Sequence, residues 1–134
     1  MLEIRKRFRD LFYPMDWYEG VAFAKQTDMY KWRQFRLAPV EPGKTFDEQS
    51  KKLPKGDEVG SAREVVTVLI VHFLATGERL ETGRLRCRES LPSGRRVLIG
   101  PFSPLGMDLG SCADAYVSPF VGLSSVFTPP VKRK

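Results

Sequence analysis

The chain has 134 residues, with 22 Lys and Arg against 16 Asp and Glu, for a formal net charge of +6. This length suits one domain, and the positive charge favours anionic partners such as nucleic acid, acidic lipid or an acidic protein surface. No apolar run reaches the roughly 18 residues of a membrane-spanning helix. The first residues lack the apolar core of a secretory signal, so an intracellular protein is expected.

Residues 1–38 are predicted to be a helical, basic and aromatic segment. Apolar side chains recur there at spacings of three and four and form one stripe: Ile4, Phe8, Leu11, Phe12 and Met15. The stripe could pack on its own domain, dock in a groove of a partner protein as a docking helix, or lie on a membrane. Glu3 and Asp10 argue against a targeting peptide, because such peptides contain few acids.

Two further helices are expected in this segment. Asp16 and Glu19 have the spacing of a capping box for a helix ending near Lys25, and Thr27 would cap another that ends near Arg36. Residues 28–36 could instead be a strand, because their aromatics partly alternate. Basic residues lie among these aromatics, as in proteins that bind single strands, and we predict nucleic-acid or anion contacts at Lys31, Arg33 and Arg36.

Residues 39–63 are rich in Lys, Glu, Asp, Pro and Gly and contain one aromatic. Such a composition buries little surface, so this segment is predicted to be an extended linker or an arm that lies on a partner.

Residues 64–128 are predicted to form a small antiparallel β domain. Residues 65–74 are β-branched at six of ten positions and read as its first strand. A turn at 75–78 is followed by an alternating strand at 84–88, a turn at 91–94 and a strand at 96–99. A β-bulge at Gly83 would bring Leu85 and Cys87 to the core side. We therefore predict a row of outward-facing arginines for binding nucleic acid or another anion: Arg84, Arg86, Arg88, Arg95 and Arg96.

The remaining residues complete this plan. Residues 100–110 are predicted to be a packed surface loop, 111–114 to cap a short helix, 120–127 to be an edge strand, and 129–134 to be a basic tail. The predicted fold class is α+β, with N-terminal amphipathic helices, an irregular linking arm and a small antiparallel sheet of roughly three to five strands.

The sequence offers no motif for catalysis, a cofactor or a metal. His72 is the only histidine, and it lies inside the most apolar run of the chain. Cys87 and Cys112 are too far apart for a CxxC-type zinc site, and we expect two free thiols, with Cys87 facing the core. Burial would raise the pKa of the Cys87 thiol and make it a poor nucleophile. An enzyme is therefore not expected.

Two functions fit these observations. The first is a non-catalytic structural or accessory subunit of a large multi-protein assembly, either a ribonucleoprotein or a membrane complex, with other protein subunits and RNA as its partners. Its location would be a mitochondrion or another organelle. The alternative is a free-standing nucleic-acid-binding module that uses the arginine-rich face of the sheet.

Overall fold

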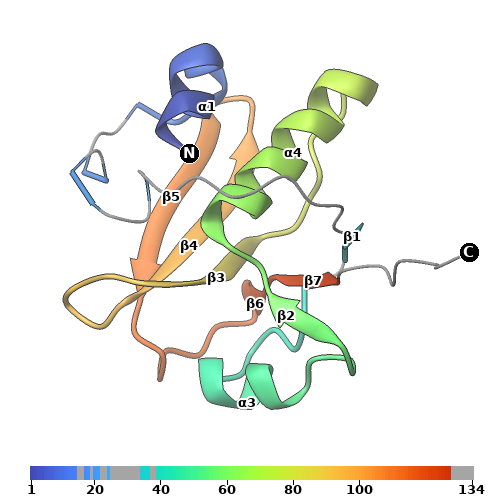
Figure 1. The fold of residues 1–134 in the computed structure, drawn as a ribbon, viewed down its shortest axis with the longest axis vertical. Coiled ribbons are helices and arrows are strands. Elements are labelled where there is room, and N and C mark those ends of the chain that lie inside the picture. The colour runs from blue at the N-terminus through green and yellow to red at the C-terminus, as the bar shows by residue number, and fades with distance from the viewer. Residues whose placement is uncertain (15–16, 19, 22–23, 25–33, 37–38, 128–134) are drawn as a thin grey trace, which may run out of the picture.

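The computed structural model describes the chain except for residues 15–16, 19, 22–23, 25–33, 37–38 and 128–134. The fold is α+β, as predicted, and contains two sheets (Figure 1). Its described elements are α1 (Leu2–Arg7), η1 (Arg9–Leu11), β1 (Gln34–Phe35), α3 (Phe46–Lys51), β2 (Asp57–Val59), α4 (Ala62–Thr76), β3 (Arg84–Ser90), β4 (Arg96–Ser103), β5 (Gly106–Cys112), β6 (Val121–Leu123) and β7 (Ser125–Phe127).

The larger sheet has four strands in the order β5-β4-β3-β6. Strands β3, β4 and β5 form consecutive antiparallel pairs, and the predicted strands at 84–88 and 96–99 are confirmed as parts of β3 and β4. Strand β6 runs parallel to β3, so the sheet is mixed and not purely antiparallel as expected. The difference arises because residues 113–120 carry the chain across the sheet from β5, on one edge, to β6 on the other.

The segment predicted as the first strand is a helix, α4. Ser61 and Glu64 form a capping box at its start, and Gly77 ends it in the left-handed conformation with a φ of 75°. Its buried side chains have helical spacing: Ala62, Val65, Val66, Leu69 and Ile70. The β-branched residues that favoured a strand are accommodated because burial of this stripe outweighs their weak intrinsic preference.

Helix α4 lies across one face of the four-stranded sheet (Figure 1) and contacts β3 and β4. Its buried stripe meets the side chains that these strands direct to the same face, including Leu85, Cys87, Val97 and Ile99, all at most 1% exposed. The predicted inward position of Cys87 is confirmed. The core therefore lies between α4 and the sheet, which leaves the opposite face of the sheet to other elements.

Residues 100–114 differ from their predicted structure. Residues 106–112 form β5, and no helix begins at 111–114, where the chain leaves β5 for an irregular loop. The bulge expected at Gly83 is also placed differently, because the register shift of the β3–β4 pair falls between Arg86 and Ser90. Gly83 has a φ of 63° and precedes β3, and a Cβ there would lie 3.0 Å from the carbonyl oxygen of Phe120.

The N-terminal stripe packs on its own domain. Phe12 is buried, and Ile4, Phe8 and Leu11 contact the main core. Tyr13 and Trp17 lie along the free edge of β5, because the Tyr13 amide donates to the carbonyl of Met107 and the Trp17 indole donates to that of Leu109, at 2.9 and 3.0 Å. Docking of the stripe on a partner stays a prediction, and Met15 lies outside the described residues.

The expected linker at 39–63 contains regular structure. Helix α3 begins at a capping box of Thr45 and Glu48, and its Gln49 is fully buried. Strand β2 joins β1 and β7 in a three-stranded sheet of order β1-β7-β2. The prediction of a linker was wrong because it rested on low hydrophobicity. This segment is instead ordered by a helix cap, by the pairing of β2 with β7 and by the buried amide of Gln49. Of the helix expected at 27–36, residues 34–35 form β1 and 27–33 lie outside the described residues.

An ion pair between Arg36 and Asp57 links β2 to the residue after β1, and the hydroxyl of Ser125 also donates to Asp57. These hydrogen bonds hold the pKa of Asp57 below its ordinary value. The charged carboxylate therefore stabilises the fold fully above the unfolded pKa of about 3.9, and this stabilisation is lost as the pH falls below it. We expect Asp57→Asn to lower the melting temperature at pH 6, and the variant's melting temperature to fall less than the wild type's between pH 5 and pH 3. Equal acid sensitivity would contradict the assignment.

Candidate binding groove on the four-stranded sheet

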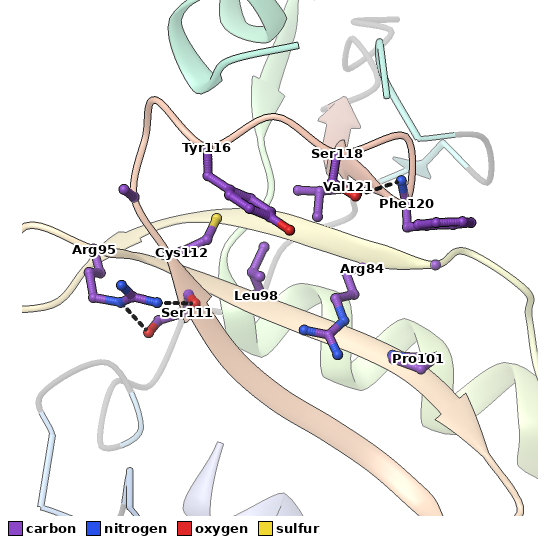
Figure 2. Close-up of a pocket in the computed structure, with 12 residues that line it drawn as sticks. Arg84, Arg95, Leu98, Pro101, Ser111, Cys112, Tyr116, Ser118, Phe120 and Val121 are labelled. Carbon is purple, nitrogen blue, oxygen red and sulfur yellow. Dashed lines mark hydrogen bonds between the residues drawn. The ribbon is translucent and has the colours of Figure 1, made fainter. Parts of the chain in front are cut away.

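The sheet face opposite α4 carries a groove of about 850 Å³ (Figure 2). Its floor is made by the small apolar cluster of Leu98, Cys112 and Val121, which project from β4, β5 and β6. One wall is formed by residues 113–120, which we call the 113–120 loop. The lining residues are Gly83, Arg84, Arg95, Leu98, Pro101, Ser111, Cys112, Ala113, Tyr116, Ser118, Phe120 and Val121.

Two arginines lie at opposite ends of this groove (Figure 2). Arg95 follows the β3–β4 turn, and its guanidinium donates to the hydroxyl and the carbonyl of Ser111 at 2.9 and 2.7 Å. Arg84 begins β3, and its side chain is 49% exposed and lies 3.8 Å from Asp108. No acidic side chain is found among the described residues that line the groove. The groove is therefore bordered by two guanidinium groups: Arg84 forms an ion pair with Asp108, and Arg95 keeps N–H groups that Ser111 does not use.

Two aromatic side chains of the 113–120 loop border the same groove. Tyr116 is 52% exposed and Phe120 is 75% exposed, which is unusual for side chains of this size. In Figure 2 the Tyr116 ring projects over the floor between the two arginines. Exposed rings beside guanidinium groups provide flat apolar surfaces next to positive charge, and this suits ligands that are both planar and anionic.

The prediction that Arg86 belongs to a solvent-exposed row of arginines was wrong. Arg86 lies on the same face as Arg84 but is completely buried beneath α3 and the 113–120 loop. Its guanidinium donates to the carbonyls of Lys44, Ala113 and Tyr116 and to Gln49 Oε1. Alternation along β3 gave the correct face, but the covering of that face by distant segments could not be deduced from alternation.

The other predicted basic contacts are dispersed. Arg96 pairs with Asp114 at 3.0 Å, and its guanidinium lies 3.9 Å from the centre of the Phe46 ring, so it also holds the 113–120 loop. Arg88 is exposed on β3 but does not line the groove, and Arg36 binds Asp57. Lys31 and Arg33 lie outside the described residues. Among the predicted basic contacts that the structure describes, Arg84 and Arg95 are the two that meet at one groove.

The two thiols and the one histidine of the chain do not meet at the groove. Cys87 faces α4 on the other side of the sheet, and burial raises the pKa of its thiol well above the ordinary value. Cys112, on the groove floor, is also buried, and both thiols are free, as predicted. His72 belongs to α4, across the sheet. Across the described ranges, no three His, Cys, Asp or Glu side chains gather as a metal site, and no helix has the length and apolarity of a membrane span.

The two aromatic side chains of the 113–120 loop were not identified from the sequence as part of a binding site. Tyr116 follows the predicted helix cap at 111–114, and Phe120 begins the predicted edge strand at 120–127, so neither was expected to border a binding site. One signal was available: the segment contains two aromatic residues but has no apolar periodicity. Aromatic side chains in such a segment are often exposed and contact a ligand. Their approach to Arg84 depends on the crossover between β5 and β6, which no local pattern specifies.

No family model, curated protein or solved structure matches this chain. Its function must therefore be inferred from its own residues and their geometry.

Proposed function

We propose that this protein is a non-catalytic nucleic-acid-binding module that holds a single strand in the groove of its four-stranded sheet. One observation carries the proposal: two accessible arginines and two exposed aromatic rings border one groove that no described acidic side chain lines. This proposal narrows the predicted arginine-rich face to Arg84 and Arg95.

The ligand class follows from the two kinds of side chain. Guanidinium groups donate paired hydrogen bonds to phosphate oxygens and stay charged at all physiological pH values. Aromatic rings stack on bases, which a single strand presents freely and a duplex keeps inside its own stack. With Arg95 and Arg84 at its ends and Tyr116 between them, the groove offers phosphate contacts that flank a stacking position.

The test is a fluorescence-anisotropy titration of a labelled oligothymidylate with the full chain. The salt slope is the change in the logarithm of the binding constant with the logarithm of the salt concentration. Two phosphate contacts on a single strand give a salt slope near −1.4, so affinity should fall about 7-fold between 50 and 200 mM salt. A blunt-ended duplex of equal charge should bind more weakly, because its bases are paired and stacked inside the helix and cannot reach Tyr116. Equal binding of strand and duplex, or no binding at 50 mM salt, would contradict the proposal.

A second candidate is an accessory subunit of a larger assembly inside the cell, such as a ribonucleoprotein of a mitochondrion or another organelle. It is favoured by Val71 and Leu74, which are each 57% exposed on the outer side of α4 and are separated by less than one turn. A protein subunit could cover this apolar surface. Native size-exclusion chromatography of the endogenous protein should then show a mass far above 15.3 kDa, whereas elution as a monomer would contradict this candidate.

A further inference from the structure

We propose that Arg86 is a positioning residue for this groove: it fixes the 113–120 loop so that Tyr116 and Phe120 border the binding surface. The inference rests on the proposed function for its ligand. Its structural part, the ordering of the loop, can be measured independently of any ligand.

Arg86 has an unusual environment for a charged side chain. It is 0% exposed, and its described hydrogen-bond acceptors are all neutral oxygens. The carbonyl of Lys44 and Oε1 of Gln49 lie 2.9 and 2.8 Å from one terminal nitrogen, and the carbonyls of Ala113 and Tyr116 accept from the other. Burying a charge without a carboxylate is costly, and each carbonyl offsets only part of that cost.

The positions of these acceptors show what the arrangement holds together. They belong to two regions that are distant from each other in the sequence: α3 with the turn before it, and the beginning of the 113–120 loop. A planar guanidinium with five donors can satisfy oxygens from several directions at once, which an ammonium group or an apolar side chain cannot do. Arg86 therefore attaches the loop, through Ala113 and Tyr116, to the middle of β3.

Gln49 extends the attachment to the other end of the loop. Its amide nitrogen donates to the carbonyls of Glu41 and Val121, both at 3.0 Å, while its oxygen accepts from Arg86. Because Val121 follows the loop directly, the Arg86–Gln49 pair holds both of its ends. Between these ends lie the two exposed rings of the groove.

Arg86 does not line the groove, so it acts on a ligand indirectly, through the residues that it holds in place. This gives a signature that separates positioning from phosphate contact. Removing a phosphate contact should make the salt slope less steep by about 0.7 for a single strand. Disturbing the loop should instead weaken binding at every salt concentration and leave the slope unchanged.

The experiment compares Arg86→Lys with Arg88→Lys, the same substitution at an exposed position of the same strand. Hydrogen exchange should be faster in Arg86→Lys at the amides of Tyr116 and Val121, which bond within the loop, and unchanged in α4. Oligothymidylate affinity should fall about 10-fold, comparable to the loss of one stacked base, with the wild-type salt slope. Arg88→Lys should change neither quantity.

The inference would be overturned if the loop amides of Arg86→Lys exchanged at the wild-type rate. It would also be overturned if oligothymidylate binding by this variant had a less steep salt slope than the wild type. If the wild-type protein fails to bind oligothymidylate, the proposed ligand is wrong, whereas loop exchange still decides whether Arg86 orders the loop. If Arg86→Lys does not fold, Gln49→Leu provides a second variant, because it removes one acceptor of Arg86 and the donor to Val121. Faster loop exchange in that variant supports the inference, and wild-type exchange overturns it.

Discussion

Replacing both Arg84 and Arg95 with alanine is expected to weaken oligothymidylate binding about 100-fold, at roughly 10-fold for each charge-assisted contact. The salt slope should also become less steep, because no phosphate would remain paired with a groove arginine. Both side chains are accessible, and neither holds the core, so the melting temperature should change little. Anisotropy titrations at several salt concentrations, together with a thermal melt, would measure both quantities.

The matched control is Arg88→Ala. Arg88 carries the same charge on the same strand as Arg84 but does not line the groove, so its loss should change affinity less than 2-fold. If Arg88→Ala weakens binding by the roughly 10-fold expected for each groove arginine, the protein attracts nucleic acid through its net charge alone. In that case the groove would not be the binding site.

Leu69→Ala and Ile70→Ala should each destabilise the protein by about 3 kcal/mol, within the roughly 2–5 kcal/mol of buried large-to-small substitutions. The two residues are adjacent in the sequence and at most 2% exposed. A helix that faces the sheet can bury neighbouring residues, whereas a strand with one buried face directs them to opposite sides. Chemical denaturation of the two variants therefore tests the assignment of 62–76 as a helix.

Leu74→Ala is the control for these substitutions, because it makes the same change on the same helix. Leu74 is 57% exposed, so this substitution should change the protein's free energy of unfolding by no more than about 0.5 kcal/mol. Alanine is also a slightly better helix former than leucine, which offsets part of any loss. A large effect at Leu74 combined with a small effect at Ile70 would be incompatible with α4 as described.

The β3–β4 hairpin was predictable because its signals are local. Polar and apolar residues alternate along 84–88, and Gly94 follows a proline in the turn that joins the two strands. The prediction for α4 was wrong because β-branched content was given more weight than periodicity. The sequence held two better signals, the capping pair of Ser61 and Glu64 and the helical spacing of apolar residues that ends at Gly77.

Strand β5 and the groove depend on contacts that are remote in the sequence. Glycines at 106 and 110 lower the strand propensity of β5, and the strand is fixed by pairing with β4. The groove requires the loop after β5 to lie over β3, where Arg86 meets Tyr116, 30 residues further along the chain. Alternation along β3 predicts the same exposed face for Arg84 and Arg86, and only the fold shows that Arg84 is exposed and Arg86 is buried.

The most direct test of the central claim is residue-level hydrogen exchange of the full chain with and without saturating oligothymidylate. The groove proposal predicts added protection in the 113–120 loop and at the adjoining ends of β3 and β5, with α4 unchanged. Protection confined to α4 or to the N-terminal helix α1, with the 113–120 loop unchanged, would contradict it.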